Sequence, residues 1–160
     1  MELASDCVPI DEIGKARLGD YDLVIFGGSL HAVGINGYRQ FKKYIPRIGF
    51  KKIVVFAVGA SPAKEGIEEE IRSENLKGEE ERRIPLFYLR GGFDYSKLNF
   101  TNKALMQLLK LKMKLSKDKT ADERGTLAAY EKPLDATARE KLKPLLEYVK
   151  TAYIRGAPKT

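Results

Sequence analysis

A continuous apolar run that ends in glycines limits the possible folds of this chain more than any other stretch; it lies within YDLVIFGGSLHAVGING, Tyr21 to Gly37. The run from Leu23 to Phe26 has no polar alternation, which predicts a strand covered on both faces inside an α/β sheet. Gly27 and Gly28 predict the end of that strand, and helical spacing of apolar residues follows from Ile35 to about Ile48. The segment is therefore predicted to be strand, tight loop and helix.

The glycine loop after this strand has two interpretations. In open α/β sheets a ligand usually lies against such a loop, because glycines let it approach the backbone and the next helix presents free N–H groups. The loop therefore predicts a binding site. Turn formation alone explains the glycines equally well, so the loop by itself does not decide between a ligand and a turn.

Two further apolar runs without alternation predict buried strands at Ile53–Gly59 and Ile84–Leu89. The helix after the first of them is acidic in its first turns, where carboxylates stabilise the helix dipole. Alternating strands and helices predict a parallel sheet of right-handed βαβ units. The three strand exits are then expected at one edge of the sheet, as a shared ligand rim. These exits are Gly27–Gly34, Gly59–Pro62 and Arg90–Asp94.

The two ends of the chain carry weaker signals. Cys7, Val8 and Ile10 predict a brief edge strand. Asp135 predicts the N-cap of a final helix, in which Pro144 is expected either to kink the helix or to occupy an early position. Between them, residues 116–131 are polar and are expected to form an irregular connection.

A helix predicted from about Phe100 to Leu115 has lysines on one side and leucines on the other. It either packs on the sheet with a solvated basic face or offers a surface to anionic lipid or a partner. Nucleic acid is not expected as a partner, because no aromatic residues interleave with the lysines.

Composition fits one soluble domain, residues 1–160, with 1–20 as a short N-terminal segment and 154–160 as a frayed tail. The 160 residues are 43% hydrophobic and 32% charged, with a net charge of +7. That charge suits nucleic acid, an anionic membrane surface or a phosphate-bearing ligand alike. Cys7 is the only cysteine and His31 the only histidine, which argues against an internal disulfide and a zinc site and fits a cytoplasmic location.

Three stretches carry a family resemblance by their order and spacing: YDLVIFGGSLHAVGI, KKIVVFAVGASP and PLFYLRGGFDYSKLNF. With the Leu/Lys/Met helix that follows, they resemble the flavodoxin-like domain proteins of bacteria and archaea. The resemblance is greatest to the branch that includes menaquinone-dependent protoporphyrinogen oxidases, and it spans Asp20 to Ala152. It implies a three-layer flavodoxin-like parallel sheet with strand order 2-1-3-4-5 and FMN held at the strand ends.

The resemblance also implies which residues contact the flavin. The first loop would flank the flavin ring with Gly28, Ser29, Leu30, His31, Ala32 and Gly34. Further parts of the rim would be Gly59, Ala60, Ser61, Gly91 and Gly92. No catalytic side chain and no metal ligand is implied, because the flavin itself carries the electrons. His31 is interpreted either as a residue that stacks on the ring or as a solvated loop residue.

One family feature has no counterpart in the sequence. Flavodoxins begin with a strand and a Ser/Thr-rich loop that binds the FMN phosphate, whereas Met1 falls near the start of the family's second strand. We therefore expect an N-terminally truncated fold, and no tight FMN binding by this chain alone. In this topology the missing strand lies between the second and the third, so its absence would leave the edge of Leu23–Phe26 unpaired. We expect the N-terminal strand, a separate polypeptide or a second copy to cover it, and of these a homodimer.

Two functions follow from the resemblance. The first is a flavodoxin-type FMN-binding redox or electron-transfer protein of the protoporphyrinogen oxidase kind, an FMN-dependent oxidoreductase if the phosphate loop is supplied. Its helix at 100–117 would then touch the inner face of the membrane peripherally. The second is a truncated flavodoxin-like module without flavin that serves as an assembly or interaction domain.

Overall fold

The computed structural model describes residues 4–31, 33–50, 53–92, 96, 103, 107, 110–111 and 135–156. The strands are β1 (Val24–His31), β2 (Gly34–Ile35), β3 (Ile53–Gly59) and β4 (Leu86–Arg90). The α-helices are α1 (Tyr38–Phe41), α2 (Ile45–Ile48), α3 (Ile67–Asn75) and α6 (Lys143–Gly156). The 3-10 helices are η1 (Ile10–Lys15), η2 (Leu18–Asp20), η3 (Lys42–Tyr44), η5 (Glu81–Arg83) and η7 (Arg139–Leu142).

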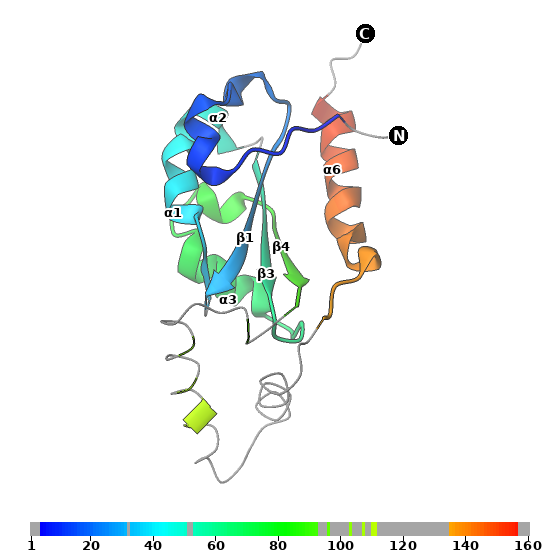
Figure 1. Cartoon of the computed structure of the whole chain (residues 1–160). Coiled ribbons are helices and arrows are strands. Elements are labelled where there is room, and N and C mark those ends of the chain that lie inside the picture. The colour runs from blue at the N-terminus through cyan, green and yellow to red at the C-terminus, as the bar shows by residue number, and fades with distance from the viewer. Residues whose placement is uncertain are drawn as a thin grey trace.

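The strands form one sheet in the order β2-β1-β3-β4. β1 pairs in parallel with β3, and β3 in parallel with β4, so these three strands point the same way (Figure 1). The predicted α/β flavodoxin-like architecture is confirmed. The expected gap between the strand at Leu23–Phe26 and the next strand is wrong, because β1 pairs directly with β3 and only its other edge lacks a parallel neighbour. β2 is an addition that the sequence did not predict: it pairs antiparallel with the end of β1, through Leu30 with Ile35 and His31 with Gly34.

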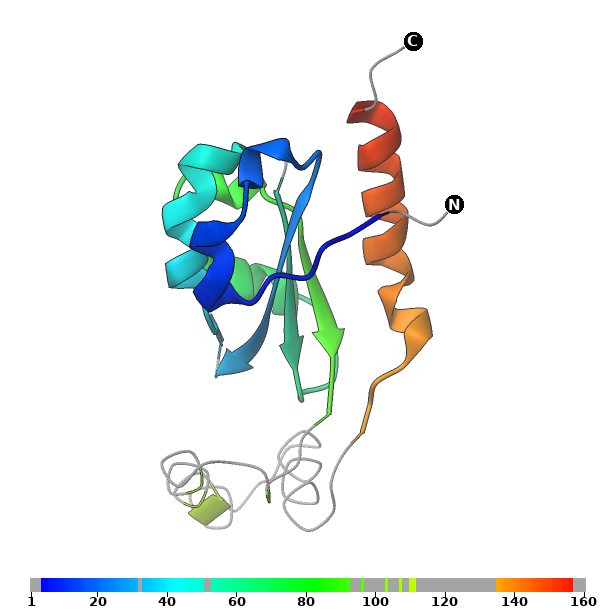
Figure 2. The ribbon, with the colours of Figure 1, turned by 45° about the horizontal axis from the view of Figure 1, so that its top comes forward.

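Helices cover both faces of the sheet and complete three layers. The helices α1, α2 and α3 lie on one face, and α6 lies on the other (Figures 1 and 2). Phe26, Phe41 and Ile71 belong to the larger core cluster, between the sheet and the first three helices. Leu145 and Val149 of α6 pack on Val54 in a smaller cluster.

A continuous helical segment from Tyr38 to Ile48 combines α1, η3 and α2. It lies between Gly37, with φ 80°, and Gly49, with φ 84°. Such positive φ angles favour glycine, which has no Cβ to clash with the backbone. The predicted helix is confirmed, but it begins later than Ile35 because that residue belongs to β2.

The interpretation of the first strand needs two corrections. β1 runs to His31, so Gly27 and Gly28 lie inside the strand and do not end it. The strand is also not covered on both faces, because Phe26 is 7% exposed whereas Ile25 is 43% exposed. An uninterrupted apolar run therefore does not by itself show that both faces of a strand are buried. Here α6 packs on Val54 and leaves Ile25 in solvent.

The N-terminal segment contains no strand among residues 4–9. The predicted edge strand at Cys7, Val8 and Ile10 is wrong, because the chain turns into η1 directly after Pro9. Ile13 of η1 and Leu18 of η2 are buried in the larger core cluster. The segment is also held by the Tyr21 hydroxyl, which donates to Asp6 Oδ2 over 2.8 Å.

The C-terminal helix is confirmed, but its predicted cap is wrong. Asp135 Oδ1 accepts hydrogen bonds from the backbone N–H and the hydroxyl of Thr137, which lower the pKa of the Asp135 carboxyl. These bonds close a local turn before η7, so Asp135 does not cap α6. Pro144 occupies the second position of α6, as one of the two expectations had it.

Several expectations fall wholly or mainly outside the described residues: most of the helix at about 100–117, the connection 116–131 and the tail beyond Gly156. No helix in the described part of the chain is long and apolar enough to cross a bilayer.

Asn75 joins α3 to the β1–β2 hairpin. The backbone N–H of Ile35 donates to Asn75 Oδ1 over 2.8 Å, and Asn75 Nδ2 donates to the carbonyl of Val33 over 2.7 Å. Asn75→Ala should lower the free energy of unfolding by about 2 kcal/mol, because the N–H of buried Ile35 loses its acceptor. Urea unfolding measures this loss. Ser73→Ala on the exposed side of α3 is the control, and an equal loss in both variants would contradict the assignment.

Candidate functional site

The carboxyl ends of the parallel strands meet at one edge of the sheet, as predicted. Gly59 is paired with Arg90, and the N–H of Gly91 donates to the carbonyl of Gly59 over 2.8 Å. Arg90 Nε donates to the carbonyl of Ala60 over 3.3 Å. These contacts join the exits of β3 and β4 into what we call the rim. The third predicted exit continues beyond Gly92 into residues outside the described part.

Tyr88 holds the loop after β3 in place, and sequence reasoning missed it. Its hydroxyl donates to the carbonyl of Ser61 over 2.7 Å, and burial raises the pKa of this phenol above its ordinary value. Its backbone N–H lies on the outer edge of β4 and donates to Glu68 Oε1 over 2.9 Å. Tyr88 sits in the middle of an apolar strand, so only the pairing partners of β4 could have shown its role.

The predicted flavin loop after the first strand is not a loop. Gly28, Ser29, Leu30 and His31 all belong to β1, Gly34 belongs to β2, and Ala32 lies outside the described residues. Ser29 accepts two hydrogen bonds from Asn36, one at its hydroxyl from Nδ2 and one at its carbonyl from the backbone N–H. The side chains of Ser29 and His31 are exposed near the end of the strand, beside the rim.

The two glycines of β1 allow close packing within the chain. A Cβ atom on Gly27 would lie 2.1 Å from Cζ of Phe56, so the ring of Phe56 would have to shift. A Cβ on Gly28 would lie 2.6 Å from the carbonyl oxygen of Asn36. Both distances are far below a van der Waals contact, so neither position tolerates a side chain as the structure stands. Neither a ligand nor a turn is needed to explain these residues.

Side chains of the same chain also lie close to the glycines of the rim. A Cβ on Gly59 would lie 2.7 Å from the hydroxyl oxygen of Tyr88, and one on Gly91 would lie 2.5 Å from Cγ1 of Val58. By contrast, Ser61 and Gly92 are exposed. Ser61 and Gly92 are therefore the most exposed of the predicted rim residues after β3 and β4, Gly59 and Ala60 are half-buried, and Ser29 and His31 lie beside them.

The buried carboxylate of Glu81 is a structural group. It is 7% exposed, and its Oε1 lies 2.7 Å from Nζ of Lys42. The hydroxyl of Tyr38 donates to its other oxygen over 3.5 Å, and burial together with this carboxylate raises the pKa of Tyr38. Both oxygens of Glu81 are therefore engaged in joining η5 to the helical segment from Tyr38 to Ile48.

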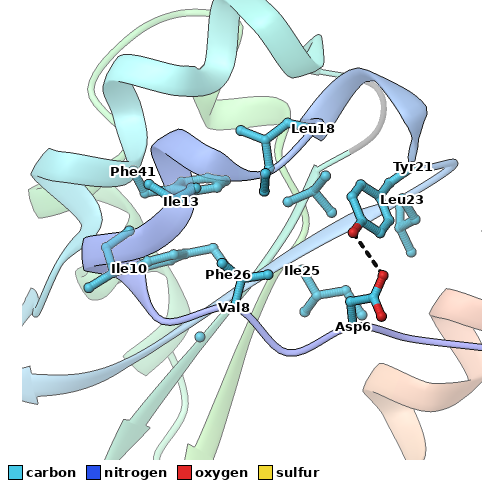
Figure 3. A pocket seen from close by; sticks show the side chains of 13 residues that line it. Asp6, Val8, Ile10, Ile13, Leu18, Tyr21, Leu23, Ile25, Phe26 and Phe41 are labelled. Carbon is cyan, nitrogen blue, oxygen red and sulfur yellow. Dashed lines mark hydrogen bonds between the residues drawn. The ribbon is translucent and has the colours of Figure 1, made fainter.

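A cavity of about 170 Å³, lined mainly by apolar residues together with Asp6 and Tyr21, lies between the N-terminal segment and β1 (Figure 3). Its wall includes every residue from Leu23 to Gly27. Successive strand residues point to opposite faces of a sheet, so a cavity that touches five in a row lies along the strand's edge. Val8, Ile10 and Ile13 contribute to the opposite wall.

The sequence matches the family described as Flavodoxin domain, Flavodoxin_5, over residues 2–122. The chain belongs to this flavodoxin domain family. Comparison with curated proteins and with solved structures gives no match. The family accounts for the parallel sheet and for the rim at its carboxyl edge, the place where ligands bind in open α/β sheets.

Flavodoxin domains are associated with FMN, which has a flat flavin ring at one end and a phosphate at the other. The described residues can be compared with what each end requires. The rim offers small exposed residues and backbone groups to a flat ring. The helix after β3 does not suit the phosphate, because the first turn of α3 carries Glu68, Glu69 and Glu70, which repel an anion. An open groove of about 470 Å³ beside Tyr88 includes two of these carboxylates. The rim therefore presents small exposed residues, whereas the acidic start of α3 does not suit a phosphate.

The described residues contain no cluster of three or more His, Cys, Asp or Glu side chains that could hold a metal ion.

Proposed function

We propose that this flavodoxin domain takes part in FMN-dependent electron transfer, with the flavin ring placed at the rim beside Ser61 and Gly92. The observation that carries the proposal is the meeting of three parallel strand ends at one edge of a chain that belongs to the flavodoxin domain family. FMN, when bound, supplies the electron transfer. The chain would supply orientation and a local electrostatic field.

The residues of the rim have separate tasks in this proposal. Tyr88 fixes the carbonyl of Ser61 and with it the loop after β3. Arg90 is half-buried, and its Nε is held by the carbonyl of Ala60, so its positive charge stays near the ring. A fixed cation near a flavin favours its reduced, anionic form. His31 is exposed at the end of β1, where it would border the ring.

Oxidation of protoporphyrinogen is the finer form of the proposal. It is supported by the order and spacing of the three sequence stretches quoted above. With a quinone as the acceptor, the lysine-bearing helix at about 100–117 would bring the domain to an anionic membrane surface.

A comparison of FMN with riboflavin tests the placement of the ring. Because the proposal places the contacts on the ring and the acidic start of α3 repels a phosphate, both should bind with dissociation constants within about threefold of each other. Quenching of flavin fluorescence measures both constants. FMN binding at least about tenfold tighter than riboflavin would show a phosphate site in this chain and contradict the assignment.

A matched pair of variants tests the rim itself. Ser61→Glu should weaken the binding of both flavins by about tenfold, because a carboxylate repels the oxygen-rich edge of the ring. Ser5→Glu adds the same charge beside Asp6, near the amino end of β1, and should leave binding unchanged. Equal effects of the two variants would remove the rim from the binding site.

A flavin-free interaction module is the second candidate. The observation that favours it is the close approach of Tyr88 to Gly59 and of Val58 to Gly91, which leaves no room for a side chain at either glycine. If this candidate is right, the purified protein is colourless and neither flavin is quenched at any concentration tested.

A further inference from the structure

We propose that the outer edge of β1 binds an extended strand of a separate polypeptide, which pairs with the backbone beside Ile25 and Gly27. This inference goes beyond the proposed function, since it concerns a different edge of the sheet and requires no flavin. It rests on backbone groups, on the mainly apolar cavity along them, and on the position of β2.

The direction of the backbone groups follows from Ser29. Its carbonyl accepts the N–H of Asn36, on the side of β1 that faces away from β3. In a parallel strand the N–H and C=O of alternate residues point to the same side. Those of Ile25 and Gly27 therefore also point away from β3. Within the described residues, no backbone or side-chain group forms a hydrogen bond with them there. They form the unpaired half of a β ladder.

The surroundings of these groups are apolar. Ile25 is 43% exposed and Val8 is 41% exposed, and both belong to the wall of the cavity along the edge. Covering a side chain of this size removes apolar surface from water and contributes about 1 to 2 kcal/mol. A strand with valine or isoleucine at alternate positions would cover this surface and complete the ladder at once.

A small apolar molecule is a poorer occupant than a peptide. It would remove water from the outward N–H and C=O groups of Ile25 and Gly27 without replacing their hydrogen bonds. Leaving a buried backbone group unsatisfied costs about 1 to 3 kcal/mol. A β-strand pairs with these groups and fills the apolar space, as in peptide recognition by strand addition.

The position of β2 disfavours a second copy of this chain. A two-fold axis through the edge would pair the two β1 strands antiparallel around Ile25 and Gly27. β2 lies on the same edge, beside Leu30 and His31. In such a dimer, β2 of one copy would overlap with the residues that precede β1 in the second copy, so the two copies would clash. A strand of a separate polypeptide that lies beside Ile25 and Gly27, and ends before it reaches Asn36 on the same edge, avoids this clash.

The N-terminal segment flanks the edge and must move when a strand enters. Paired strands lie about 4.8 Å apart, and a cavity of about 170 Å³ is too small for a strand of several residues. Residues 4–9 are exposed along their whole length, and the hydrogen bond from Tyr21 to Asp6 lies at the surface. Moving this flank aside therefore disturbs little buried structure.

The test uses a fluorescein-labelled peptide of alternating valine and threonine with a lysine at each end. Fluorescence anisotropy should show saturable binding to the complete chain. A peptide of the same sequence with alternate backbone nitrogens methylated should bind at least about tenfold more weakly, because it cannot complete the ladder. Equal binding of the two peptides would overturn strand pairing, and so would the absence of binding.

Two substitutions at one position locate the binding edge. Ile25→Pro removes the outward N–H and keeps the groups of Val24 and Phe26 that face β3, and proline is tolerated at such an edge. It should weaken peptide binding at least about tenfold, whereas Ile25→Thr, which keeps the N–H, should stay within about threefold. Equal binding by both would overturn the proposal. If Ile25→Pro does not fold, the methylated peptide decides.

Sedimentation of the chain without peptide tests whether a second copy of the chain occupies the edge of β1. A monomer is expected. A dimer that Ile25→Pro dissociates would place a second copy on the edge and overturn the proposal. Flavin binding and peptide binding are measured separately, so the failure of one is distinguishable from the failure of the other.

Discussion

Replacing Phe41 with alanine should lower the free energy of unfolding by about 3 to 5 kcal/mol, the range for removing a fully buried aromatic ring. Phe41 is 1% exposed, and its ring stacks on that of Phe26 with centroids 4.6 Å apart. The pair joins α1 to the centre of β1. The cavity left by the ring cannot close, because Phe26 is fixed by its strand. Urea unfolding followed by circular dichroism measures the loss.

Phe50→Ala is the matched control for this substitution. Phe50 is half-buried and packs at the margin of the same cluster, so its loss should cost less than about 2 kcal/mol. Similar losses in the two variants would show that the stacked pair is not the main contact between the helices and β1.

Replacing Gly27 with valine should lower the free energy of unfolding by about 3 kcal/mol, at the upper end of the cost of overpacking a core. A Cβ at this position would lie 2.1 Å from Cζ of Phe56, so the ring must leave its place on the sheet. Gly19→Val is the control, because nothing lies within 4 Å of a Cβ at Gly19. A mild effect at Gly27 would mean that the ring moves freely.

A double substitution shows whether Phe56 is the cause. Phe56→Ala removes the ring, so Gly27→Val should cost much less in that background. The two changes should therefore be less than additive, as expected for residues in direct contact. Additive losses would assign the need for Gly27 to the backbone and not to the ring.

The architecture could be predicted because its signals are local. The apolar runs at Ile53–Gly59 and Ile84–Leu89, each followed by small residues, identify strands without knowledge of their neighbours. The parallel arrangement then follows from the helices between them, and with it the meeting of the strand exits at one edge.

The roles of individual residues in the site could not be predicted, because they depend on distant contacts. A glycine is needed at position 27 because a Cβ there would meet the ring of Phe56, which lies on another strand. A glycine is needed at position 28 because a Cβ there would meet the carbonyl oxygen of Asn36, which follows β2. In the sequence both look like the glycines of a binding loop. Likewise, the role of Tyr88 depends on the carbonyl of Ser61, and no local pattern shows that pairing.

The contact between Glu68 and the backbone of Tyr88 has a consequence for crowded solutions. Sheets that grow into fibrils need two attachable borders, so that each molecule can join a neighbour on either side. Here the carboxylate already occupies the N–H of Tyr88 on the border beyond β4. One outward hydrogen-bonding group of β4 is therefore already engaged within the chain, which disfavours the pairing of a neighbouring strand at that position.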